Sequence, residues 1–315
     1  SGMFPQLQRA VLLVLFLFLP GLFDAATRGV MDAAEVTVYY DDSLQAAARE
    51  VVALYPKAKA AIEGTLPWKV GFKPTVILTG RASFQHFSQN PKIVAFAVPA
   101  DNLIVIDHSR VAADPSTLAA TLKHEICHLQ LHHYIARGRL PRWLDEGYCQ
   151  WTSDGIAEVF IDSRTSQIER AVLAGRLIPL HDLSSAFPSE ERSLVLAYEE
   201  SKSVVEYVIR EHGFPSLMAV FDNLKAGYSI DKAIEAALSY PTPDLEEQWL
   251  RALRGHIGWV SYFSTYIYEF LFLLGALVTV YGFVRLMRRI RTAKDQPDDE
   301  ETTGPSDRPG NSDDP

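Results

Sequence analysis

The sequence predicts an α+β protein: a small N-terminal mixed or antiparallel sheet, then a helical subdomain, then a C-terminal transmembrane helix. Short β-rich runs are confined to the part before residue 110, helical patterns dominate from about 115 to 255, and a long uncharged stretch follows. Because strands come first and helices later, we expect an α+β domain and not a parallel βαβ one. Of 315 residues, 48% are hydrophobic and 22% are charged, which is ordinary for a chain that buries a core.

Residues 3–26 read as a signal peptide or an N-terminal anchor. Arg9 precedes an apolar run from Val11 to Leu19, which Pro20 and Gly21 interrupt. The residues before Ala25 and Ala26 suit a cleavage site poorly. A cleaved signal and an uncleaved anchor therefore both stay open.

Residues 30–255 form the main predicted domain. Its strands are expected at 35–40, 73–79, 93–98 and 103–107, the last two as a hairpin, and an Ala-rich amphipathic helix is expected at 44–62. Further helices are expected near 165–175, 190–212, 214–224, 229–239 and 245–254.

A helix from Ser116 to Ala136 carries the first half of a metal-site pattern. Neither Gly nor Pro interrupts it, and its apolar residues form one surface. His124 and His128 are four residues apart and therefore share a face, so both imidazoles can reach one metal ion. Glu125 between them is placed to deprotonate a water on that ion.

Glu146 offers the third ligand. Gly138 is expected to end the first helix and Pro141 to begin a second, so two antiparallel helices would bring Glu146 opposite the histidine pair. Two His, one Glu and water make the ligand set of a hydrolytic zinc site, and Zn²⁺ is the predicted cofactor. His132 shares the ligand face, but three ligands already suffice.

Residues 124–128 (HEICH) and 143–147 (WLDEG) together resemble the gluzincin zinc metallopeptidases, in particular the peptidase MA-like domains related to aminopeptidase N. The resemblance covers about residues 70–255 and implies a zincin-type helical subdomain, a peptide or protein substrate and a bacterial origin.

The resemblance also implies roles for individual residues. His124, His128 and Glu146 would bind zinc, and Glu125 would act as general base. Tyr198 is the counterpart of a tyrosine that stabilises the oxyanion in the aminopeptidases, and a plain packing role for it is an equal alternative.

Two departures from the aminopeptidase pattern bear on activity. The segment 95–102 lacks the Glu with which aminopeptidases capture the free amine of a substrate, so an endopeptidase is favoured. Gln150 stands one helical turn after Glu146, where a carboxylate usually supports a histidine ligand; Asp145 and Asp154 are candidate substitutes.

Cys127 and Cys149 are the only two cysteines, one beside each half of the metal pattern. A disulfide that clamps the two helices and a pair of buried thiols both stay open.

The C-terminal region carries a membrane signal. Residues 263–284 are predicted to span the bilayer, since Glu269 is the only charge between Ile257 and Val284. The basic residues that follow place the metal domain outside the cytoplasm. Residues 285–315, basic and then acidic, are expected to form a disordered cytoplasmic tail.

Residues 295–315 carry eight acids and one arginine, a net charge of −7, whereas residues 285–294 carry five basic residues and no acid. The rest of the chain accounts for about −7 of the total of −9, and this mild acidity disfavours nucleic acid as a partner. These features predict a zinc-dependent endopeptidase anchored in a bacterial cell membrane. The alternative is a non-catalytic, zinc-containing scaffold that binds envelope proteins or peptides. Retention of Glu125 argues against that alternative, because zinc binding does not need this residue and hydrolysis does.

Overall fold

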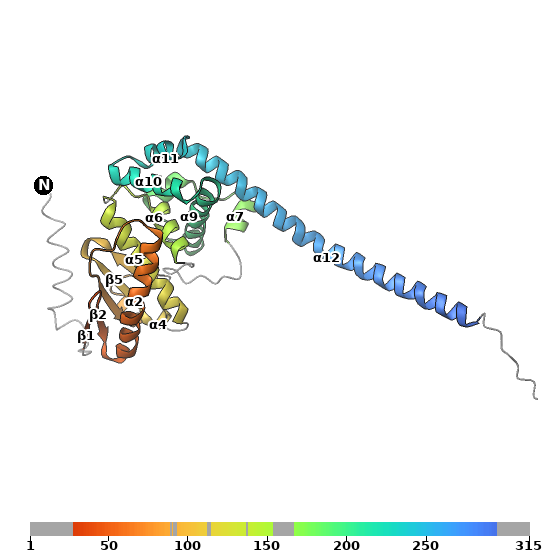
Figure 1. Ribbon diagram of the computed structural model, residues 1–315, viewed down its shortest axis with the longest axis horizontal. Helices are drawn as coiled ribbons and strands as arrows, with labels where there is room; N and C mark the ends of the chain where they lie inside the picture. Colours follow the sequence, from red (N-terminus) through yellow and green to blue (C-terminus); the bar gives the residue numbers. More distant parts are fainter. Residues whose placement is uncertain are drawn as a thin grey trace, which may run out of the picture. The chain divides into compact units, whose positions relative to one another are not determined.

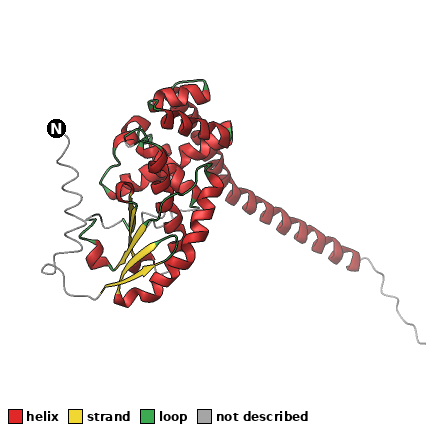
Figure 2. Cartoon of the chain, turned by 60° about the vertical axis from the view of Figure 1, so that its left-hand side comes forward, coloured by secondary structure: helices red, strands yellow, loops and turns green. Residues whose placement is uncertain are grey.

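The computed structural model describes residues 28–88, 90, 93–111, 115–136, 138–153 and 167–294. The predicted signal segment 3–26, Asp154 and the end of the tail lie outside these residues. Figures 1 and 2 show a small sheet with helices packed on it, followed by a long C-terminal helix.

Within the described residues, five strands form one mixed sheet in the order β1-β2-β3-β5-β4. The strands are β1 (Arg28–Asp32), β2 (Thr37–Asp41), β3 (Thr75–Thr79), β4 (Ala95–Val98) and β5 (Leu103–Asp107). β2 pairs with β3 and β3 with β5 in parallel, while β1 and β4 form antiparallel edges. The sheet is mixed, as predicted.

Two details of the sheet differ from the prediction. β2, the helix α2 (Gln45–Thr65) and β3 form a parallel βαβ unit, which the order of elements had argued against. Strand β1 was not predicted, because its sequence RGVMD has no clear alternation.

The two faces of the sheet bury different clusters. Val38, Val76 and Ile104 point to the main core, which α2 and α5 (Pro115–Tyr134) complete. Ile77 and Val105, one position along, join a smaller cluster on the opposite face. This alternation is the period of two that a strand imposes on its side chains.

The other α-helices in the described part of the chain lie mostly after the sheet. They are α3 (Arg81–Phe84), α4 (His108–Val111), α6 (Arg142–Thr152), α7 (Gln167–Ala174), α8 (Leu180–Ser185), α9 (Glu191–His212), α10 (Phe214–Ala226), α11 (Ile230–Leu238) and α12 (Thr242–Lys294). The α+β class with a sheet before the helices is therefore confirmed.

The chain divides into two compact units, Ser1–Arg254 and Gly255–Pro315. Within α12, the segment Ile267–Arg289 is long and apolar enough to cross a membrane. The described side chains of this segment are exposed. The predicted span 263–284 overlaps most of it.

Candidate metal centre

Two helices carry the predicted site. α5 holds His124 and His128 one turn apart, and α6 returns beside it with Glu146. The connection includes Gly138 at a φ of 84°, a backbone conformation that glycine adopts readily, and Pro141 directly before α6. The expected two-helix unit is therefore present.

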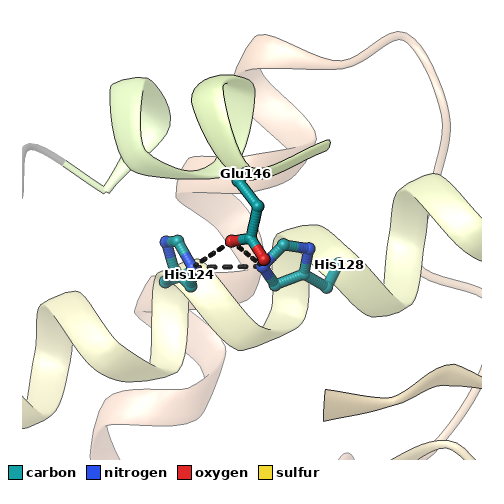
Figure 3. A group of neighbouring side chains, drawn as sticks. All are labelled: His124, His128 and Glu146. Atoms are coloured by element: carbon teal, nitrogen blue, oxygen red, sulfur yellow. Dashed lines mark hydrogen bonds and ion pairs between the residues drawn. The ribbon is translucent and has the colours of Figure 1, made fainter. Parts of the chain in front are cut away.

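The three predicted ligands converge (Figure 3). His124 Nε2 and His128 Nε2 are 3.0 Å apart, and Glu146 Oε2 lies 3.7 Å from the former and 3.4 Å from the latter. All three residues are buried.

These separations suit a zinc ion. Ligand atoms at about 2.0–2.1 Å around a tetrahedral zinc lie roughly 3.3 Å from one another, which is close to the separations found here. Glu146 Oε2 is buried beside the two imidazole nitrogens, and a cation held between these three atoms would satisfy it. The donor set, two imidazoles and one carboxylate, is one that zinc prefers.

Asp145 supports one of the histidines. Its Oδ1 lies 2.7 Å from His128 Nδ1, and its Oδ2 lies 2.7 Å from His132 Nε2. Asp145 was one of two residues proposed to replace the carboxylate that usually supports a histidine ligand, and it does contact His128. Gln150, at the usual position, is fully buried and makes no hydrogen bond through its amide within the described residues.

The charged groups of the cluster shift one another's pKa values. Burial by itself would raise the pKa of Glu146, but the charge on His128 and hydrogen bonds from both histidines lower it to about 2. Burial would lower the pKa of His128, but Asp145 and Glu146 outweigh it and raise that pKa well above its ordinary value. The two carboxylates thus stabilise positive charge on the groups beside them.

Arg142 is a neighbour of the site that the sequence did not single out. Its Nη2 lies 3.5 Å from Glu146 Oε1, one helical turn away, which leaves Oε2 toward the histidines. The guanidinium also lies 4.7 Å from the ring centroid of Phe187. The i, i+4 spacing of an arginine and a glutamate was the available signal.

Glu125 and Tyr198 are both fully buried. Glu125 follows His124 on α5. Tyr198 lies on α9, and its ring meets Phe187 edge to face at 5.1 Å between centroids. Contacts therefore run from Tyr198 through Phe187 and Arg142 to Glu146. A role for Tyr198 in oxyanion stabilisation remains a prediction.

A disulfide joins the two helices. Cys127 precedes His128 and Cys149 lies three positions after Glu146, with 5.5 Å between their Cα atoms. Of the two alternatives left open by the sequence, the structure has the disulfide. The bond clamps α5 to α6 next to the residues that converge.

The fold and this site together define a zincin-type protein. Residues 87–255 match the Peptidase MA superfamily, and the chain belongs to that superfamily. It is therefore a member of a metallopeptidase superfamily.

Two solved structures of yeast LTA4 hydrolase are also similar in fold. The complex with bestatin shares 14% identity at a TM-score of 0.43, over 70% of this chain and 37% of that one. The native enzyme shares 12% identity at a TM-score of 0.44, over 71% and 38%. This chain thus spans well under half the length of those proteins. A comparison with curated proteins found no match.

Proposed function

We propose that this protein is a membrane-anchored zinc endopeptidase in which His124, His128 and Glu146 hold the metal and Glu125 is the general base. The observation that carries the proposal is the convergence of His124 Nε2, His128 Nε2 and Glu146 Oε2 at separations of 3.0 to 3.7 Å. Membership of the Peptidase MA superfamily supports it.

The residues of the chain divide the work of hydrolysis. Bound zinc supplies Lewis acidity, which polarises the scissile carbonyl and makes water more acidic. Glu125 accepts the proton of the attacking water and passes it to the leaving amine. Tyr198 donates a hydrogen bond to the oxygen of the tetrahedral intermediate.

The edge strand β4 favours cleavage within a chain over removal of its first residue. Among the described strands β4 pairs only with β5, so an extended peptide could pair with its other edge. Its sequence AFAV and the residues that follow, up to 102, contain no Glu that could match the amine-binding Glu of the aminopeptidases. An endopeptidase substrate paired with this strand would extend past the site in both directions.

The segment Ile267–Arg289 would anchor the enzyme. At 1.5 Å per residue, its 23 residues reach about 34 Å, enough for the hydrocarbon core. Arg285, Arg288 and Arg289 at one end would stay in the cytoplasm. The disulfide supports an oxidising location for the site, outside the bacterial cytoplasm.

Substitution of Glu125 by Gln tests the proposal. The full-length chain in detergent, as wild type and as Glu125→Gln, is assayed for zinc content and for cleavage of an unstructured protein. We expect equal zinc in both and at least a thousandfold slower cleavage by the variant, because Gln cannot accept the proton.

The same assay separates the alternatives. Zinc in both proteins with cleavage by neither would favour the non-catalytic scaffold. Absence of zinc from the wild type would overturn the proposal.

A further inference from the structure

His132 occupies the same face of α5 as the two proposed histidine ligands, at the next i+4 position. It does not join them: its Nε2 lies 2.7 Å from Asp145 Oδ2. The other oxygen of the same carboxylate lies 2.7 Å from His128 Nδ1. Asp145 therefore bridges two imidazoles that stand one helical turn apart.

We propose that His132 is a positioning residue: through Asp145, it holds the ring of His128 so that Nε2 faces His124 and Glu146. This inference rests on the proposed zinc site. It assigns to His132 a role in metal affinity without direct contact to the metal.

A carboxylate that makes only one hydrogen bond can still rotate. The last torsion of an aspartate is soft, so a single hydrogen bond does not fix the plane of its two oxygens. Asp145 has hydrogen bonds at both oxygens, to His128 and His132 on successive turns of one helix, and the two bonds together fix the plane of the carboxylate. Removal of His132 would leave Oδ2 free to turn away and take Oδ1 with it.

Burial makes these two hydrogen bonds effective. The side chains of His132, Asp145 and His128 are 22%, 14% and 7% exposed. Water competes only weakly for such groups, and a charge-assisted hydrogen bond is stronger there than at the surface. Asp145 is also adjacent to Glu146 on α6, so its position and that of the carboxylate ligand are set together.

The orientation has a direct consequence for the metal. A histidine binds zinc through a nitrogen that carries no proton, and the partner of the other nitrogen selects which one that is. Asp145 accepts a hydrogen bond from Nδ1 of His128, so Nε2 presents its lone pair. Nε2 is the atom that lies 3.4 Å from Glu146 Oε2.

The size of the effect follows from the distance to the metal. Loss of a residue that directly supports a ligand typically lowers metal affinity by 10- to 100-fold. His132 acts one contact further out, so we expect His132→Ala to lower zinc affinity by roughly 3- to 10-fold. His132→Gln keeps an N–H donor of similar reach and should retain most of the affinity.

The experiment measures zinc affinity of the full-length chain in detergent, by competition with a metal-binding dye. His133→Ala is the matched control: it is the next residue on the same helix, and its ring packs on Phe72 and Tyr134. Thermal melting in excess chelator shows whether each variant folds as the wild type does.

A double-mutant cycle supplies the decisive comparison. Asp145→Asn should weaken zinc binding by 10- to 100-fold, as expected for a direct support. If His132 acts through Asp145, then His132→Ala should cause no further loss in the Asp145→Asn background.

Three results would overturn the inference: wild-type affinity in His132→Ala, an equal loss in His132→Gln and His132→Ala, or an undiminished loss in the Asp145→Asn background. If His132→Ala fails to fold, the cycle is run with His132→Phe. A wild type without zinc would instead refute the proposed function. Zinc binding without proteolysis would refute only its catalytic part and would leave this test intact.

Discussion

At the scale of single residues, Glu200 links the stability of the helical region to pH. It is fully buried on α9, where both of its oxygens accept the backbone N–H of Ile178, at 3.0 and 3.2 Å. Burial, aided by the nearby charges of Glu246 and Glu199, raises the pKa of Glu200 from 4.5 to about 8, although the Ile178 hydrogen bond opposes the shift. The folded protein therefore keeps a proton on Glu200 that the unfolded chain loses.

A raised pKa of an acid stabilises the folded state at low pH. This contribution is fully present below pH 4.5 and is lost as the pH rises toward 8. Glu200→Gln keeps an oxygen acceptor for Ile178 and carries no charge. In the wild type the free energy of unfolding should fall as the pH rises above about 5, and in Glu200→Gln it should fall less. At pH 8 the variant should therefore be more stable than the wild type by about 1–3 kcal/mol.

Denaturant unfolding between pH 5 and pH 9, followed by tryptophan fluorescence with chelator present, measures this difference. Glu206→Gln is the control, because its side chain is 46% exposed on the same helix. Parallel pH profiles for the wild type and Glu200→Gln would contradict the prediction.

At the scale of elements, the crossing of α6 and α9 depends on Gly147. A Cβ atom added there would lie 2.2 Å from the backbone oxygen of Ser201 and 2.6 Å from its carbonyl carbon. Two backbones cannot relieve such a clash by turning a side chain, so the helices would have to separate. Gly147 follows Glu146, and the same movement would displace the proposed ligand.

Gly147→Ala should therefore lower the free energy of unfolding by about 3 kcal/mol and also weaken zinc binding. Gly64→Ala is the control, because it lies within α2 and an added Cβ meets no atom within 4 Å. That variant should be up to about 1 kcal/mol more stable, since alanine favours a helix over glycine. Equal stabilities for the two variants would show that the α6–α9 contact is not tight.

At the scale of the whole molecule, the proposed anchoring predicts an orientation. In spheroplasts, protease added outside should digest the unit Ser1–Arg254 and leave a tag on the C-terminus protected. Cys127 and Cys149 should resist alkylation until a reductant is added, because they form a disulfide.

Replacement of Arg285, Arg288 and Arg289 by Glu should expose the tag in part of the molecules, while replacement by Lys should not. A tag that the protease reaches in the wild type would contradict the orientation.

Much of the site was predictable because its pattern is local. The pair His124 and His128 shares a face of any helix by spacing alone, and Gly138 and Pro141 indicate where the chain turns back. The predicted helices at 190–212, 214–224 and 229–239 correspond closely to α9, α10 and α11. The uncharged run before Arg285 likewise indicates a span by length and composition.

The class of the fold, the two-helix unit and the candidate ligands were thus predictable from the amino-acid sequence, since each depends on residues close together along the chain. Four features became visible only in the folded protein: the parallel pairing of β2 with β3, the disulfide, the bridging of His128 and His132 by Asp145, and the close approach of Gly147 to Ser201. Each of these requires the distance and orientation between separate elements. Those quantities arise only when the elements pack, because no local period or propensity encodes them.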